Sequence, residues 1–213
     1  MARRRNTGRR SIRPVMRIFT EGERTEINYV RGYISSYLKS RGYTAHDIVI
    51  EQPNDSSPLG LLNAARLAKL PMDEMWIVFD CDRHSRKPEA FKGASEDGIG
   101  IAYSSISFEA WILLHFTYST RPYGSCDDLV KVLDKHFPNG YDKAMNNLFE
   151  ETAGADHAGL RKAIANARRL DSEMQRVNPG KPIYELNPYT NVHELLGAID
   201  AFIMRNHSKT KRE

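Results

Sequence analysis

This sequence is poor in cysteine and has no long apolar run, and both shortages narrow what the protein can be. Its 213 residues include only two cysteines, Cys81 and Cys126, too few for a disulfide framework or a four-ligand zinc site. We expect both to be reduced thiols. No apolar run approaches the roughly 20 residues that cross a bilayer, and the arginine-rich start lacks the apolar stretch of a secretory signal. We therefore expect a soluble, cytoplasmic protein that does not bind membranes.

Two familiar catalytic signatures are missing as well. No glycine-rich loop ends in Gly-Lys-Ser or Gly-Lys-Thr, so we do not expect this chain alone to hydrolyse ATP. The histidines lack zinc-ligand spacing, because His193-Glu194 has no second histidine of a zinc protease. What the sequence does contain is 40% hydrophobic residues, which is enough for a buried core in a chain of this length.

The basic residues gather at the two ends of the chain. Residues 1–17 contain seven arginines and no acid, and residues 205–213 add an excess of about three positive charges. Because the whole chain carries +4, the middle is left at about −6. Basic ends suit contact with nucleic-acid phosphates, since guanidinium pairs bidentately with phosphate; a solubilising tail is the alternative. The arm residues predicted to contact nucleic acid are Arg3, Arg4, Arg5, Arg9 and Arg10.

Strand-like and helix-like segments alternate along the first half of the chain, which is typical of an α/β fold. Apolar runs predict strands over 15–20, 47–51, 74–79 and 98–104, with helices over 25–39 and 59–70 between the first three. Strands separated by helix-length segments form right-handed β-α-β units. We therefore predict a parallel sheet of about four strands flanked by helices.

The second half of the chain is predicted to be mainly helical. Its predicted helices cover 108–115, 126–135, 157–176 and 192–205, and the first is apolar nearly all round, which marks it as buried. Asn191 followed by Glu194 has the form of a capping box for the last helix. The expected organisation is an arginine-rich arm (1–14), an α/β core (15–116), a helical extension (117–206) and a basic tail (207–213).

Two of the predicted strands end in acidic residues. One apolar run leads into Glu21-Gly22, and another leads into Asp80-Cys81-Asp82. Because parallel α/β sheets bind ligands at the carboxyl ends of their strands, we expect these carboxylates in one crevice. Asp80 and Asp82 alternate along an extended chain, so both can face the same side. Hard carboxylate oxygens favour Mg²⁺ or Mn²⁺ over zinc.

Each of these acids also has a plainer interpretation. Glu21 could simply begin the next helix, where acids favour the positive end of the macrodipole, and Asp80 and Asp82 could belong to a polar loop. Glu26 and Glu109 lie in the first turns of predicted helices, where they either cap the dipole or join the acidic cluster as metal ligands.

Basic residues follow the second acidic pair at once. Arg83 and Lys87 could balance the acids or grip a phosphate, and His84 could exchange a proton, although a single loop histidine is more often a bystander. His115, Tyr118 and Tyr123 could stack on bases, but packing in the core or at its rim is the more common use of such residues.

These residues resemble known patterns. The two acidic strand ends, with one strand and two helices between them, look like the Toprim fold of topoisomerases, primases and the nuclease half of the OLD family. More narrowly, four motifs in order are similar to the RloB-like family of prokaryotic proteins: Glu21-Gly22-Glu23-Arg24-Thr25-Glu26, Phe79-Asp80-Cys81-Asp82-Arg83-His84, Ser107-Phe108-Glu109-Ala110-Trp111-Ile112-Leu113-Leu114-His115-Phe116 and Asn187-Pro188-Tyr189-Thr190-Asn191-Val192-His193. Tyr141-Asp142-Lys143 is a weaker match, and the chain departs from the family at Ser105-Ile106-Ser107, where Asn-Pro is usual.

The resemblance implies a small Toprim-like protein of restriction and phage-defence loci, often beside an ATPase partner, with a suspected nuclease activity. In Toprim enzymes the glutamate matching Glu21 is a general acid or base, and the aspartates matching Asp80 and Asp82 hold Mg²⁺. The roles of the acids matching Glu26 and Glu109, and of Lys143, are left open.

Three hypotheses follow for function. The first is Mg²⁺- or Mn²⁺-dependent hydrolysis of phosphodiesters in DNA or RNA, with Glu21 and His84 moving protons and with Asp80, Asp82, Glu26 and Glu109 as the metal ligands. The second is a non-catalytic nucleic-acid-binding module that acts only with a partner. The third is metal-dependent chemistry on a small nucleotide.

Overall fold

The computed structural model describes residues 13–81 and 86–210, and for 207–210 it describes the backbone only. Several predicted site residues lie outside these ranges, so nothing is said of their surroundings and the predictions about them stay predictions. They are Arg3, Arg4, Arg5, Arg9, Arg10, Asp82, Arg83 and His84.

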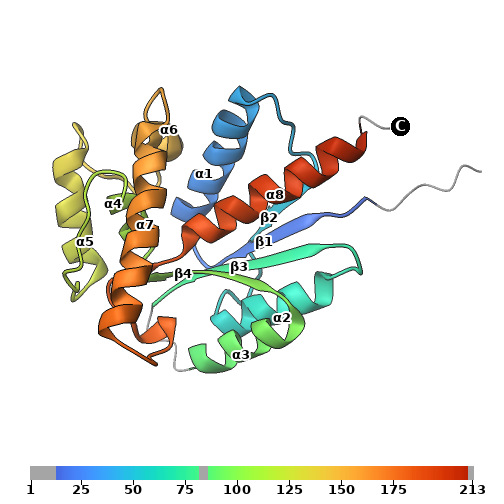
Figure 1. Cartoon of the computed structure of the whole chain (residues 1–213), viewed down its shortest axis with the longest axis horizontal. Helices are drawn as coiled ribbons and strands as arrows, with labels where there is room; N and C mark the ends of the chain where they lie inside the picture. Colours follow the sequence, from blue (N-terminus) through green and yellow to red (C-terminus); the bar gives the residue numbers. More distant parts are fainter. Residues whose placement is uncertain (1–12, 82–85, 211–213) are drawn as a thin grey trace, which may run out of the picture.

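A five-stranded sheet in the order β2-β1-β3-β4-β5 forms the centre of the protein (Figure 1). The strands are β1 (Met16–Thr20), β2 (Ile48–Glu51), β3 (Glu74–Asp80), β4 (Gly100–Ser105) and β5 (Tyr189–Thr190). The first four are parallel, and β5 is antiparallel to β4. Because β1 and β3 are neighbours with Thr20 opposite Val78, the residues that follow both strands leave the sheet at the same edge.

Helices cover both faces of the sheet. The pair α2 (Pro58–Ala68) and α3 (Lys87–Asp97) lies on one side, and α1 (Thr25–Gly32) and α8 (Val192–Thr210) lie on the other (Figure 1). Local chemistry sets their ends: the Ser57 hydroxyl accepts a 3.2 Å hydrogen bond from the Gly60 N–H at the start of α2, and Gly98 (φ 62°) ends α3 in the left-handed conformation. A π-helical segment, Tyr33–Leu38, continues α1.

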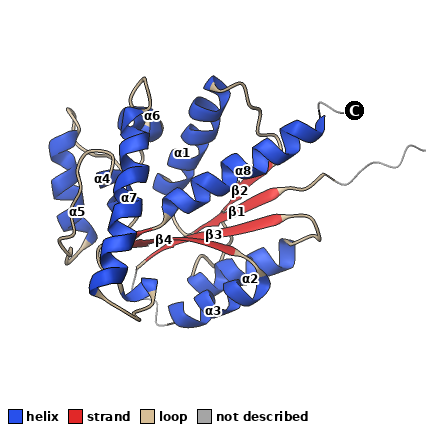
Figure 2. Ribbon diagram, in the orientation of Figure 1, coloured by secondary structure: helices blue, strands red, loops and turns tan. Residues whose placement is uncertain are grey.

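The remaining helices gather beyond the carboxyl ends of the parallel strands (Figure 2). They are α4 (Glu109–Leu113), α5 (Cys126–Leu133), α6 (Leu148–Ala153) and α7 (Ala158–Val177), with short 3-10 turns at Asp134–His136 and Ile183–Glu185. The α4 segment is buried as predicted, with Trp111 and Ile112 fully shielded from solvent. A single buried cluster runs from the strands through α4 to α7 and α8, so one core supports both halves of the chain.

The α/β class, the parallel strands and the helical second half are confirmed. The structure adds α3, α6 and β5, which the sequence pattern did not predict. Within the described part of the chain, no helix combines the length and the apolar character needed to cross a bilayer.

Asn191 joins the last helix to the sheet instead of closing a capping box. Its Oδ1 accepts a 2.7 Å hydrogen bond from the Tyr103 N–H, and its Nδ2 donates to the Ile101 carbonyl (3.0 Å) and to a Glu194 carboxylate oxygen (3.0 Å). Its own N–H donates to the Tyr103 carbonyl. The expected capping box is therefore wrong in detail, because the side-chain oxygen that would cap α8 is bound to β4.

Replacing Asn191 by alanine should lower the free energy of unfolding by about 2–4 kcal/mol, because the Tyr103 N–H and the Ile101 carbonyl lose buried partners. Urea denaturation measures this change. The matched control is Asn63→Ala on the exposed side of α2, which should leave stability unchanged or slightly raised because alanine is the better helix former. Equal effects of the two substitutions would contradict this role of Asn191.

Candidate metal and catalytic site

Glu21 and Asp80 come together at the edge of the sheet. The Asp80 N–H, at the end of β3, donates a 3.0 Å hydrogen bond to Glu21 Oε2, and the Glu21 N–H donates to the Val78 carbonyl. The crevice expected at the ends of these two strands is therefore present, although the chemical roles of the two residues stay predictions.

Glu26 lies over the turn that follows β1. It is in the first turn of α1 and is only 5% exposed. A Cβ built on Gly22 would lie 1.9 Å from Glu26 Oε2, closer than any real contact. Glycine at position 22 therefore leaves room for the Glu26 carboxylate to pack directly against the backbone, and a larger residue would displace that carboxylate.

Glu109 reaches the same place from the start of α4. Its carboxylate is almost fully buried and accepts a 3.2 Å hydrogen bond from the Tyr141 hydroxyl. The Lys143 Nζ lies 3.5 Å from Glu109 Oε1, and the Cys126 thiol lies 3.6 Å from Oε2. Glu109 therefore belongs to the acidic cluster and does more than cap a helix.

One cavity of about 320 Å³ collects these side chains, and we call it the acid cavity. It is lined by Glu21, Gly22, Glu23, Arg24, Thr25, Glu26, Asp80, Phe108, Glu109 and Lys143. The four predicted site residues that share the acid cavity come from three separate chain segments: the β1–α1 turn, the end of β3 and the start of α4.

Burial and mutual repulsion make ionisation unfavourable in the acid cavity. Burial raises the pKa of Asp80 well above its ordinary value, and the charges of Glu26, Glu109 and Glu21 add to this effect, while a hydrogen bond from the Phe108 backbone opposes it. Burial likewise raises the pKa of Glu26 to about 7, helped by the charges of Glu109 and Glu21. Carboxyls with raised pKa values in a cleft are typical of functional sites.

The donor set fits a hard divalent cation. Carboxylate oxygens are the ligands that Mg²⁺ prefers in proteins, and a bound dication would relieve the repulsion that raises these pKa values. Among the residues that the structure describes, no three His, Cys, Asp or Glu side chains already stand in a metal-coordinating arrangement. Asp82, the remaining predicted ligand, lies outside the described residues.

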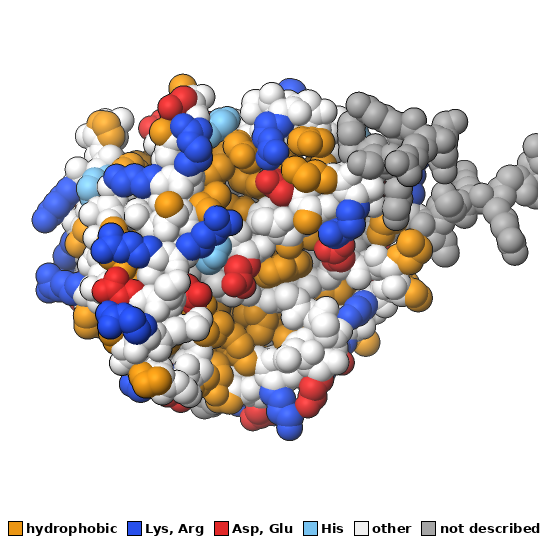
Figure 3. Space-filling view, viewed as in Figure 1, with side chains coloured by type: hydrophobic (Ala, Val, Ile, Leu, Met, Phe, Trp, Pro, Cys, Tyr) orange, Lys and Arg blue, Asp and Glu red, His pale blue; other side chains and the backbone are white. Residues whose placement is uncertain are grey.

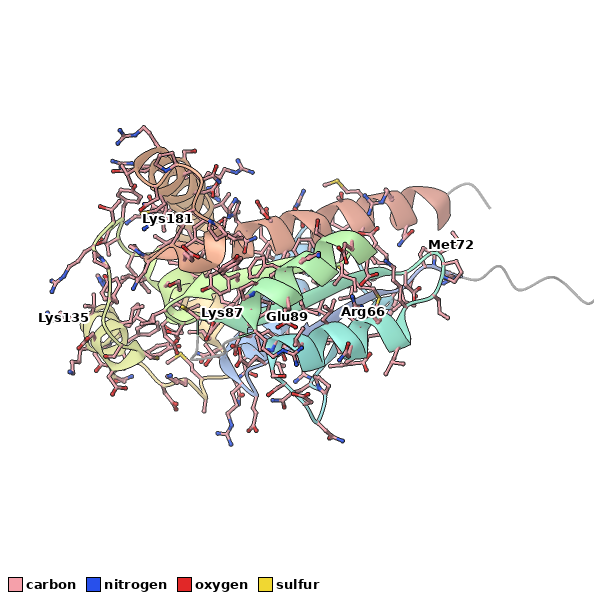
Figure 4. All side chains as sticks on the ribbon, turned by 90° about the horizontal axis from the view of Figure 1, so that it is seen from below. Arg66, Met72, Lys87, Glu89, Lys135 and Lys181 are labelled. Atoms are coloured by element: carbon pink, nitrogen blue, oxygen red, sulfur yellow. The ribbon has the colours of Figure 1, made fainter. Side chains whose placement is uncertain are left out.

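Lys87 turns toward the end of β3, outside the lining of the acid cavity. It begins α3 close to Glu89, as Figure 4 shows, and its Nζ lies 3.2 Å from Cys81 Sγ. Burial opposes ionisation of the Cys81 thiol, but hydrogen bonds from Tyr103, Lys87 and Ser105 outweigh it and lower the pKa. Contact of Lys87 with nucleic acid stays a prediction.

The aromatic candidates pack as the plainer interpretation expected. His115 is buried, its Nε2 is 2.9 Å from the Tyr29 hydroxyl, and burial lowers the pKa of the imidazole to about 4. Tyr118 donates to Glu173 and lies beneath the Arg169 guanidinium, 3.9 Å from the ring centroid. His115 is therefore a core residue, and Tyr118 packs at the rim of the core.

A larger hollow, about 620 Å³, lies elsewhere, between α2 and α3. Two of its charged lining residues, Arg66 and Glu89 (Figure 4), form exposed ion pairs: Glu89 with Arg86 of the lining, and Arg66 with Asp97 at the end of α3. None of the acid-cavity residues lines it. Because the carboxylates converge in the acid cavity, that cavity is a better candidate for a catalytic site than the larger hollow.

A basic surface on α7 was not predicted from the sequence. Lysine and arginine side chains gather on the side of the molecule where α7 lies (Figure 3), and the exposed basic residues of this helix are Arg161, Lys162, Arg168, Arg169 and Arg176. Their helical spacing was present in the sequence, but nothing in that pattern separated a binding surface from an ordinary solvated face.

Comparison with known proteins identifies one family. A family model described as RloB-like protein matches residues 16–199, which include every residue of the acid cavity. No curated protein and no solved structure matches the chain significantly.

The raised pKa of Glu26 predicts how stability depends on pH when EDTA removes divalent cations. The folded state holds its proton up to about pH 7, whereas the ordinary value is 4.5, so the free energy of unfolding should fall as pH rises from about 4.5 to about 7. Glu26→Gln should reduce this fall by about 3 kcal/mol. Urea denaturation at intervals between pH 4.5 and 8 measures it.

The control for this experiment is Glu23→Gln. Glu23 is exposed and lies three residues before Glu26, so its neutralisation should leave the pH profile unchanged. An identical slope in wild type and Glu26→Gln would show that burial and the neighbouring charges do not raise the pKa of the Glu26 carboxyl.

Proposed function

This chain belongs to the RloB-like family, and we propose that it is a Mg²⁺- or Mn²⁺-dependent nuclease that hydrolyses phosphodiester bonds in DNA or RNA. The observation that carries the proposal is the convergence of Glu21, Glu26, Asp80 and Glu109 in one cavity at the carboxyl edge of a parallel sheet. Such a cluster of two buried and two half-buried carboxylates is costly to the fold unless it serves a ligand.

In this proposal Asp80, Glu26 and Glu109, with Asp82, hold the cation. When bound, the cation polarises the scissile phosphate and stabilises the leaving oxygen. Glu21 moves a proton to or from the attacking water, and the hydrogen bond from the Asp80 N–H keeps its carboxylate oriented at the rim of the acid cavity. His84 is a second candidate for proton transfer.

The surroundings of the acid cavity suit a phosphodiester substrate. A volume of about 320 Å³ is larger than an ion alone needs and admits a phosphate with its neighbouring sugar. The exposed arginines of α7, the arginine arm and Lys87 are the proposed contacts to the nucleic-acid backbone. The resemblance to restriction and phage-defence proteins supports a defence role beside a partner ATPase, which would supply the phosphate loop that this sequence lacks.

Asp80→Asn and Glu21→Gln should each lower the cleavage rate about 100-fold or more, because the first removes a metal ligand and the second removes the proton-transfer group. The measurement is cleavage of end-labelled single- and double-stranded DNA and RNA with Mg²⁺ or Mn²⁺.

Glu23→Gln is the matched control, since Glu23 is exposed at the mouth of the same cavity and should keep activity within about twofold of wild type. Cleavage that survives in Asp80→Asn would rule out this site. Salt-sensitive binding without cleavage, unchanged in Asp80→Asn, would favour a non-catalytic nucleic-acid-binding module instead.

A further inference from the structure

We infer that Lys143 is the internal counter-ion of the acid cavity, and that a divalent cation must displace its ammonium from Glu109 in order to bind. This inference rests on the proposed function, because it assumes that the acid cavity takes a cation. It assigns Lys143 a role in setting the affinity for that cation.

The geometry places one protein cation inside the cluster of acids. Lys143 Nζ is 3.5 Å from Oε1 of Glu109, whose side chain is only 3% exposed. A buried carboxylate needs a partner, and this ion pair supplies it in the absence of metal. Arg24, the other cation of the lining, is exposed at the mouth.

The backbone of Lys143 is fixed over the acid cavity by α1. The Thr25 hydroxyl donates a 3.1 Å hydrogen bond to the Lys143 carbonyl. The Asn28 side chain donates to the carbonyls of Ala144 (3.5 Å) and Met145 (3.2 Å). The helix that carries Glu26, α1, therefore also positions the Lys143 backbone. This fixes the start of the lysine side chain relative to the Glu26 carboxyl.

The side chain of Lys143, in contrast, can move away from Glu109. It is 54% exposed, so the ammonium can move into solvent without opening the core. Glu109 would keep its hydrogen bond from the Tyr141 hydroxyl and its contact with the Cys126 thiol. Exchange of an ammonium for a dication at Glu109 thus needs no rearrangement of the fold, but the dication must compete with the ammonium.

The test is the dissociation constant for Mn²⁺, measured by titration calorimetry on the full chain without nucleic acid. Lys143→Met should bind Mn²⁺ about five- to fiftyfold more tightly than wild type, because a competing charge is removed from a poorly solvated site. Lys143→Arg keeps the charge and should stay near wild type. The metal-free Lys143→Met protein should also melt at a lower temperature and regain the loss when Mn²⁺ is added.

Two controls separate this local effect from net charge. Lys92→Met removes a charge on α3 that pairs with Glu96, and Lys131→Met removes one on α5 that pairs with Asp128; each should change Mn²⁺ affinity less than about twofold. Circular dichroism verifies that every variant is folded.

The outcomes distinguish this inference from the proposed function. Wild-type binding that is lost in Asp80→Asn but unchanged or weaker in Lys143→Met would overturn the counter-ion role and leave the nuclease proposal standing. Binding by Lys143→Met alone would support the inference, because the lysine would then be excluding the metal. No binding by any variant would overturn both.

Discussion

The burial and like charge of four clustered carboxyls are the constraint on which the rest of this structure depends. Four acids share one cavity, and burial together with their like charges raises the pKa values of Asp80 and Glu26. A fold tolerates such an arrangement only when something nearby compensates for the charge. Backbone N–H groups contribute through Asp80 and Phe108, the Tyr141 hydroxyl contributes at Glu109, and the Lys143 ammonium supplies a full positive charge.

The surrounding architecture serves to bring distant acids to one point. Parallel pairing of β1 with β3 fixes Glu21 beside Asp80, because both strands end at the same edge. The close approach allowed by Gly22 lets Glu26 pack on that turn, and the buried α4 helix delivers Glu109 from the opposite side. The segment between α5 and α6 carries Tyr141 and Lys143, and α1 holds the lysine's backbone in place, so the second half of the chain contributes to the site as well as to the core.

The sequence predicted the centre of this arrangement well, because strong apolar strands ending in acids carry a clear signal. It did not predict α3, whose buried face consists of Ala90, Gly93 and Ala94 and therefore has little apolar periodicity. A Cβ on Gly93 would lie 2.7 Å from a Leu62 methyl, so small residues are needed there for α2 and α3 to pack. The two-residue β5 was too short for any pattern. The place of Lys143 depends on side-chain hydrogen bonds to loop carbonyls, which leave no trace in local sequence.

The late position of β5 in the chain has a consequence for synthesis on the ribosome. In the part of the chain that the structure describes, Tyr189–Thr190 and Asn191 pair with the outer edge of β4 and bind residues more than 80 positions earlier. While the chain emerges from the exit tunnel, the acid cluster is translated well before the segment that closes the sheet. The sheet is therefore completed only after residues 189–191 have left the tunnel, so its closure is a late step that comes after the acids of the cavity have all been synthesised.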